Sequence, residues 1–163
     1  MIVRILIDGY NLLHAWQEIA QGSARFSETA RDELIKALTE YSDAIGTPVT
    51  LIFDGRSPGN LPENDRHRLS RKKNPNLEIL YTPSNQSADQ LIERAAILYQ
   101  KYGQVLAVTN DNAIRDLVIG AGGTVCSCHN FIQTIHDECY QMQLNLKYHN
   151  LNTNNSFKRK HGR

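Results

Sequence analysis

The chain has 163 residues, of which 40% are hydrophobic and 21% charged, and its formal net charge is +1. These values fit one globular domain and exclude a disordered or fibrous chain, and a chain of this length buries about 70% of its unfolded surface without disulfides. It contains no run of about 20 apolar residues, and its first eight residues lack the pattern of a signal peptide, so we expect a soluble, cytoplasmic protein.

The first predicted strand covers residues 2–7, a run rich in Ile and Val that stops at Asp8. Apolar residues from Phe26 to Ile45 then recur at helical spacing, and Gly46 is placed to end that helix. A second apolar run at 49–53 stops at Asp54 and predicts the next strand.

A basic segment follows Asp54. Its Lys and Arg residues are Arg56, Arg66, Arg68, Arg71, Lys72 and Lys73, against two acids. Two alternatives stay open: the segment lays these residues along RNA phosphates, or it is a solvated loop. A third strand is predicted after it, at residues 77–81.

The second half of the sequence alternates helices and strands. Ser87 and Gln90 form a capping-box pattern that opens a helix with Asp89 in its first turn. A strand at 105–108 precedes Asp111 and a helix, a strand at 124–127 follows Gly122 and Gly123, and a last helix extends to about residue 146.

This alternation predicts an α/β fold in three layers, with a central, mostly parallel, five-stranded sheet flanked by helices. From residue 148 the composition turns to Asn, Lys, Arg and His with few large apolar side chains. We therefore expect one domain over residues 1–147 and a basic, disordered tail over residues 148–163.

The three cysteines, Cys126, Cys128 and Cys139, are an odd number, which favours reduced thiols over a disulfide framework. A zinc site that includes His129 and His136 is the alternative, but their spacing matches no common zinc motif.

Acidic side chains collect where predicted strands end. Asp8 and Asp54 end the first two strands, Asp111 follows the fourth, and Asp89 begins the helix after the third. In an open parallel sheet, ligands bind beyond the carboxyl ends of the strands. Close carboxylates repel each other, so the pattern implies a cation, and all-oxygen ligands favour Mg²⁺ or Mn²⁺.

Each acid also has a simpler explanation. Asp8 and Asp54, each followed by Gly, are possible turn residues, Asp89 suits a helix N-terminus, and Asp111 can pair with Arg115. Turn formation alone does not explain why three separate strands each place an acid at the same edge of the sheet. The combination points to metal-assisted hydrolysis of a phosphodiester.

Four segments also carry a family resemblance: IDGYNLL at 7–13, FDG at 53–55, SADQLIER at 87–94 and VTND at 108–111. In this order they resemble the YacP-type NYN family, a group of PIN-like nucleases, over residues 2 to about 136. The family usually has Thr-Ser-Asp where this chain has Thr109-Asn110-Asp111; the acid is retained, and Asn caps a helix as well as Ser.

The resemblance implies a metal-dependent endoribonuclease that cleaves messenger RNA and associates with ribosomes. On the matching positions it implies Asp8, Asp89 and Asp111 as catalytic metal ligands, with Asn11, Asp54 and Glu93 in supporting roles. Asp54 and Glu93 are further candidate metal ligands. We expect single-stranded RNA as substrate and neither an organic cofactor nor a membrane partner. The alternative is an RNA- or ribosome-binding adaptor whose metal site is weak or idle.

Overall fold

The computed structural model describes residues 1–55, 74–83 and 85–161, without the side chains of residues 152–161. In these residues the strands are β1 (Ile2–Asp8), β2 (Val49–Phe53), β3 (Leu77–Tyr81), β4 (Gln104–Val108) and β5 (Thr124–Cys126). The helices are α1 (Gly9–Ala15), α2 (Glu28–Ile45), α4 (Ala88–Tyr99), α5 (Asn112–Gly120) and α6 (Cys128–His161). The five predicted strands are thus confirmed, with ends that differ by at most one residue.

The sheet has the strand order β3-β2-β1-β4-β5, and every neighbouring pair is parallel. The chain passes from β1 outward through β2 to β3 and then crosses to β4 on the other side of β1. The strand order therefore reverses between β1 and β4, and their carboxyl ends flank the crevice where such sheets bind ligands.

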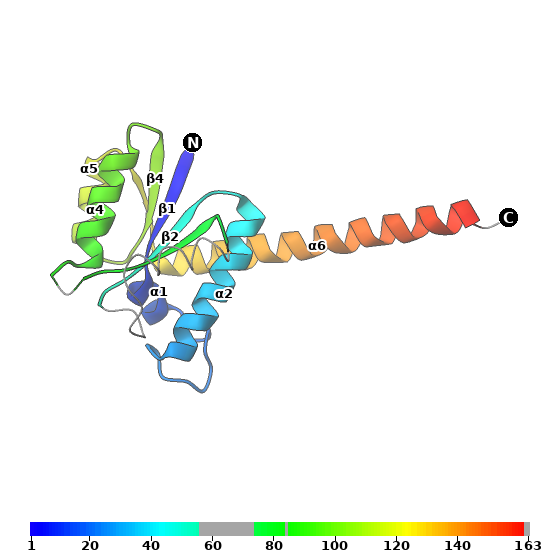
Figure 1. Ribbon diagram of the computed structural model, residues 1–163, viewed down its shortest axis with the longest axis horizontal. Helices are drawn as coiled ribbons and strands as arrows, with labels where there is room; N and C mark the ends of the chain where they lie inside the picture. Colours follow the sequence, from blue (N-terminus) through cyan, green and yellow to red (C-terminus); the bar gives the residue numbers. More distant parts are fainter. Residues whose placement is uncertain (56–73, 84, 162–163) are drawn as a thin grey trace.

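Helices cover both faces of the sheet, which confirms the three-layer α/β fold (Figure 1). Ile5 and Ile7 of β1 pack in the larger core with α1, α2 and the first turns of α6. Leu6, between them, packs in the second core with α4 and α5. Alternate residues of β1 thus serve opposite cores, as the two-residue period of a strand requires.

Helix α2 begins two residues later than its apolar pattern suggests. Ser27 is its N-cap and accepts a hydrogen bond from the Ala30 amide at 3.2 Å, and Gly46 ends it with a φ of 68°. Phe26, which we assigned to the buried stripe of this helix, lies before the cap and is 47% exposed. Tertiary packing, not the periodicity, decides the position of this side chain.

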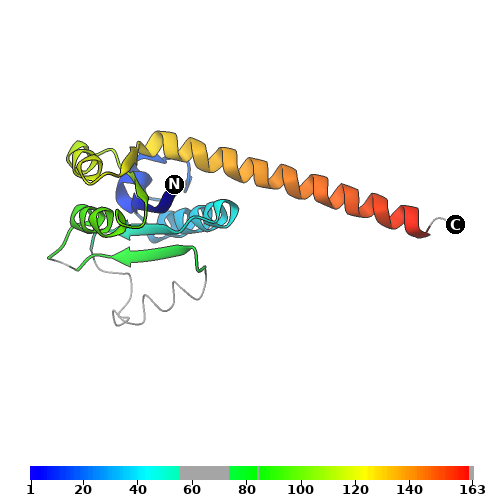
Figure 2. The same ribbon diagram turned by 90° about the horizontal axis from the view of Figure 1, so that it is seen from above.

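Helix α6 is longer than predicted and leaves the body of the protein (Figures 1 and 2). It continues to His161 in place of the disordered segment that the composition predicts after residue 147. No Gly or Pro interrupts the sequence between Gly123 and Gly162, so nothing in this stretch breaks a helix once it has started. Among residues 128–151 of this helix the buried ones are Cys128, Phe131 and Ile135, all in the first turns. That the domain itself ends at residue 147 stays a prediction.

Among the described residues, no helix combines the length and the apolar composition needed to cross a membrane.

Candidate active site

Asp8 stands at the centre of the sheet's carboxyl edge. It ends β1 and is the N-cap of α1, with its Oδ1 accepting a hydrogen bond from the Asn11 amide at 3.2 Å. The following Gly9 is buried, and a Cβ there would lie 2.5 Å from Phe53 Cε1. Gly9 is therefore required by the close packing of α1 on β2.

Asp111 has the equivalent place after β4. It is the N-cap of α5, and its Oδ1 accepts from the Ala113 amide at 2.8 Å. The amide of Asp111 donates to the hydroxyl of the buried Thr109 at 3.0 Å. The carboxyl group is thus fixed at the mouth of the crevice between β1 and β4.

Asn11 links the two sides of that crevice. Its Oδ1 accepts from the Asn110 amide at 3.0 Å and from the Cys128 thiol at 3.4 Å. Asn110 in turn accepts from the Cys128 amide at 2.9 Å through its side-chain oxygen. We expected Asn110, which replaces the usual Ser, to cap α5. The N-cap is Asp111 instead, and Asn110 connects the loop after β4 to the start of α6.

Asp54 and Asp89 come from the other side of β1. The Oδ1 of Asp54 accepts from the Ala88 amide and from the Thr82 hydroxyl, which holds the N-terminus of α4 against β2. The predicted capping box between Ser87 and Gln90 is present at this N-terminus. Asp89 is half-buried in the first turn of α4 as expected.

These four residues, Asp8, Asp54, Asp89 and Asp111, form what we call the aspartate cluster. Burial raises the pKa of Asp8 from 3.8 to about 6; the hydrogen bond from Asn11 opposes this, and Asp89, Asp54 and Asp111 each add to it. Burial also raises the pKa of Asp89, with further contributions from Asp111 and Asp54. The four carboxylates are thus close enough to repel one another.

The cluster is not arranged as a closed metal cage. Within residues 1–55, 74–83 and 85–161, no three His, Cys, Asp or Glu side chains are grouped so that they hold a metal ion. Three of the aspartates, Asp8, Asp54 and Asp111, each use one oxygen to accept a backbone amide at a helix N-terminus. The donor chemistry nevertheless fits a hard cation, because the oxygens are anionic and none of these aspartates forms a salt bridge within the described residues.

The other predicted site residues are placed less centrally. Glu93 lies one turn after Asp89 on α4 and is half-buried, but it does not contribute to the raised pKa of Asp8 or of Asp89. The basic residues predicted to bind RNA all lie outside the described residues: Arg56, Arg66, Arg68, Arg71, Lys72 and Lys73.

The cysteines do not form the zinc site considered as an alternative. Cys126, Cys128 and Cys139 are free thiols, and no metal-holding group of them with His129 or His136 occurs in the described part of the chain. Burial, with a smaller effect of Asp8, raises the pKa of Cys128 to about 12. This thiol is a buried hydrogen-bond donor and not a nucleophile.

Sequence reasoning missed the residues that hold the aspartates in place. Thr82 and Thr109 are buried hydroxyl residues that each directly follow a strand, and Cys128 supplies both a thiol and an amide to the Asn11–Asn110 bridge. A polar residue immediately after an apolar strand was the available signal for the two threonines. Nothing in the sequence indicated Cys128.

A parallel sheet covered on both faces, with acids gathered at its carboxyl edge, defines a PIN-like α/β domain. The sequence matches the model of the YacP-like NYN domain family over residues 5–161, and the chain belongs to that family. The match includes the segment after residue 136, which we expected to lie outside the resemblance.

Relatives in Bacillus subtilis agree with this assignment. The chain is 27% identical over 132 residues to a protein named uncharacterized protein YacP of strain 168, covering 80% of this chain and 74% of the relative. A crystal structure of Rae1 (YacP), W164L mutant, superimposes with a TM-score of 0.72 at 24% identity, over 91% of this chain and 83% of the other. A second Rae1 (YacP) crystal structure gives a TM-score of 0.68 at 24% identity, over 93% and 84%. The structural likeness shows a shared fold.

Proposed function

We propose that this protein is a divalent-metal-dependent endoribonuclease that hydrolyses phosphodiester bonds of single-stranded RNA in the cytoplasm. Messenger RNA in a ribosome-associated context is the substrate that membership of the family suggests. The observation that carries the proposal is the aspartate cluster, in which burial, together with the three neighbouring aspartates, raises the pKa of Asp8 to about 6. A protein gains stability by separating such charges unless a cation or a reaction requires them together.

The roles follow from the contacts. Asp8, Asp89 and Asp111 would hold Mg²⁺ or Mn²⁺ at the strand switch between β1 and β4, with Asp54 fixing α4 and Asn11 fixing the loop before α5. Glu93 would support the site from the next turn of α4. A bound divalent ion supplies Lewis-acid stabilisation of charge on the phosphoryl oxygens and lowers the pKa of the attacking water.

The Asp8→Asn variant tests this function. Asn keeps the N-cap hydrogen bond of α1 but removes the charge that a hard cation requires. We expect cleavage of an unstructured RNA in Mn²⁺ or Mg²⁺ to fall by more than about 100-fold, beyond the 10–100-fold loss typical of residues that only support metal ligands. Cleavage rates are compared by gel electrophoresis of end-labelled RNA.

Asp116→Asn is the matched control, because Asp116 is an exposed carboxylate on α5 that takes no part in the cluster. It should cleave at the parent rate. Equal rates for Asp8→Asn and the parent would remove Asp8 from the reaction.

A second candidate function is an RNA-binding adaptor with an idle metal site. It is favoured by one observation, the lack of three metal-holding side chains grouped together in the described residues. A parent protein that binds RNA but cleaves none at saturating Mn²⁺ would support the adaptor and contradict the nuclease.

A further inference from the structure

An exposed aromatic side chain lies beside the aspartate cluster. Phe26 directly precedes the N-cap of α2 and keeps 47% of its surface exposed, although the helical spacing of the sequence assigns it to the core. Its backbone is held in place, because Arg31 Nη1 donates to the Phe26 carbonyl oxygen at 3.1 Å. The ring is therefore presented to solvent from a fixed position.

A line of aromatic contacts joins Phe26 to the carboxyl edge of the sheet. The Phe26 ring packs edge-on against Tyr10 with centroids 5.6 Å apart, and Tyr10 packs against the buried Phe53 at 5.1 Å. Phe53 stacks in turn on Tyr81 at the end of β3, at 5.4 Å. Tyr10 is two residues from Asp8, so the exposed ring is anchored next to the aspartate cluster and not on a remote surface.

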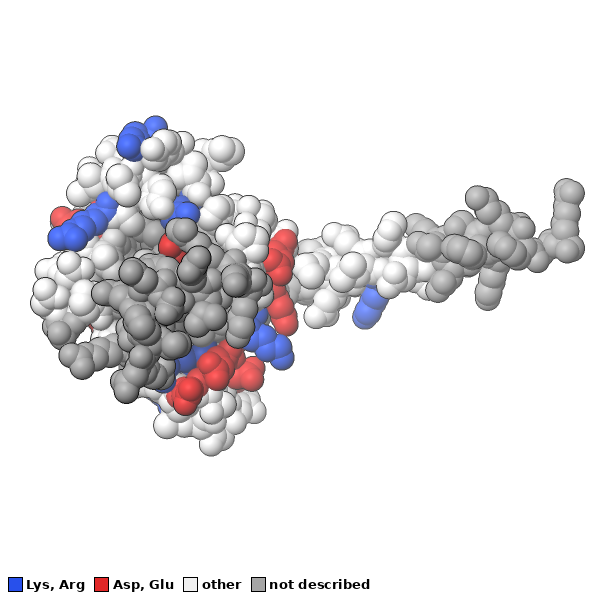
Figure 3. Space-filling model, viewed as in Figure 1, with Lys and Arg blue, Asp and Glu red and all other residues white. Residues whose placement is uncertain are grey.

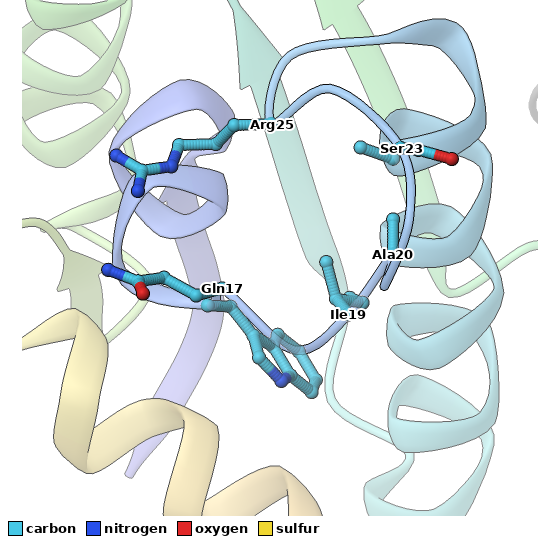
Figure 4. Close-up of a pocket in the computed structure, with 7 residues that line it drawn as sticks. Gln17, Ile19, Ala20, Ser23 and Arg25 are labelled. Atoms are coloured by element: carbon cyan, nitrogen blue, oxygen red, sulfur yellow. The ribbon is translucent and has the colours of Figure 1, made fainter.

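The same surface carries a cation. Arg25 extends from the loop between α1 and α2 toward α1 (Figure 4). Its Nη1 lies 3.0 Å from His14 Nδ1. The His14 ring is nearly parallel to that of Phe26, at an interplanar angle of 15° and a centroid distance of 6.5 Å. Because a guanidinium only donates, Nδ1 accepts and the proton of the neutral imidazole lies on Nε2, free to donate.

No carboxylate of the described residues forms a salt bridge with Arg25. Within the described ranges the salt bridge present is that of Arg4 with Glu78, on a different part of the sheet. Arg25 also borders a pocket of about 300 Å³ whose wall includes the polar side chains of Gln17 and Ser23 (Figure 4). An exposed ring beside a guanidinium group and polar side chains suits a nucleic acid better than an apolar protein surface.

We propose that Phe26, Arg25 and His14 form a single-stranded RNA subsite, in which a base stacks on Phe26 and the neighbouring phosphate is bound by Arg25 and His14. The proposal rests on the proposed function. Stacking on an aromatic ring and contact with arginine are the common means by which proteins hold unpaired RNA. His14 lies six residues after Asp8, or about 9 Å along α1, so the subsite would take nucleotides close to the cleaved bond.

The test separates stacking from packing by replacing Phe26 with Leu, which is apolar but has no aromatic ring. We expect Phe26→Leu to bind a fluorescent, unstructured ten-nucleotide RNA between about 5-fold and about 150-fold more weakly than the parent, by anisotropy in Mg²⁺. Phe26→Trp should restore binding. The loss in Phe26→Leu should disappear when the oligonucleotide is abasic, because no base is then left to stack.

Tyr102→Ala is the matched control. Tyr102 is a more exposed aromatic residue, 66% accessible, and it lies just before β4 at the opposite edge of the sheet. Its removal should leave RNA affinity unchanged. Arg25→Gln should reduce the slope of log affinity against log salt by about one phosphate contact, while Arg25→Lys should keep it.

The outcomes distinguish the subsite from the nuclease. Equal RNA affinity of Phe26→Leu and the parent, with unchanged melting temperatures, overturns the subsite even if the parent cleaves RNA. If Phe26→Leu binds RNA more weakly than the parent but the parent cleaves no RNA, the subsite is supported and only the nuclease activity is contradicted. If Phe26→Leu lowers the affinity for abasic RNA as much as the affinity for normal RNA, stacking is overturned and Phe26 has a packing role.

Discussion

Asp8 combines two opposing roles, since it caps a helix and is a buried charge among like charges. Its N-cap hydrogen bond stabilises α1, while burial and the three other aspartates raise its pKa to about 6. The sequence predicted which acids meet, because strand ends at one edge of a parallel sheet converge. It did not predict how deeply Asp8 is buried or that three of the acids would be engaged by backbone amides, since both depend on the packing of helices α1, α4 and α5.

The raised pKa makes stability depend on pH. Asp8 has a pKa near 3.8 in the unfolded chain and of about 6 in the folded protein, so the folded protein keeps this proton to a higher pH. Because the unfolded chain loses the proton first, the free energy of unfolding falls as pH rises from about 4 to about 6. Above that range the penalty is about 3 kcal/mol. Asp8→Asn should therefore be more stable than the parent by up to this amount at pH 7.5 without metal, and by much less at pH 4.5.

Urea unfolding of both proteins in a chelating buffer at the two pH values measures this difference. Other titrating groups are common to both chains and cancel. A stability difference that stays constant between pH 4.5 and 7.5 would show that the charge of Asp8 is not the cause.

The strands were predictable and the connections between helices were not. Each strand is a short, mostly apolar run that stops at a polar residue, so local sequence defines it. Helix α1 has only seven residues, too few for a clear period, and depends on Gly9 packing under Phe53. The bridge from Asn11 to Asn110 and Cys128 joins residues 99 and 117 positions apart. No local sequence pattern predicts hydrogen bonds between residues so far apart in the chain.

That bridge leads to a prediction for Asn11→Ala. The substitution removes the link between α1 and the loop that carries Asp111. The loss of one such hydrogen bond lowers the free energy of unfolding by only about 1 kcal/mol, so the protein should stay folded. We expect RNA cleavage to fall by about 10–100-fold, as for other residues that orient metal ligands, with a folded circular dichroism spectrum. Asn130→Ala, in an exposed position on α6, is the control. An Asn11→Ala protein with full activity would show that the bridge does not position the site.

The projecting part of α6 is helical where the composition predicts disorder. The segment has few apolar residues, which suggested disorder, yet a stretch without Gly or Pro continues the helix that Phe131 and Ile135 anchor to the body. Acidic side chains lie near the base of this projection, and none is visible along its described part (Figure 3). From Cys139 to the end of the chain the sequence contains no Asp or Glu.

A chain that ends at Lys147 tests whether the domain ends where the composition changes. Among residues 128–151 of α6, the buried ones all precede this point, and Tyr148 and Leu151 are 67% and 60% exposed, so we expect the core to survive the truncation. We expect the melting temperature to fall by less than about 4 °C, the change that about 1 kcal/mol produces in a protein of this size.

The deleted segment contains Lys158, Arg159, Lys160 and Arg163. If they bind RNA phosphates, the salt dependence of RNA affinity will weaken by up to about four contacts, and an unchanged slope will assign the phosphate contacts to the rest of the protein. A large loss of melting temperature would instead place residues 148–163 within the folded domain.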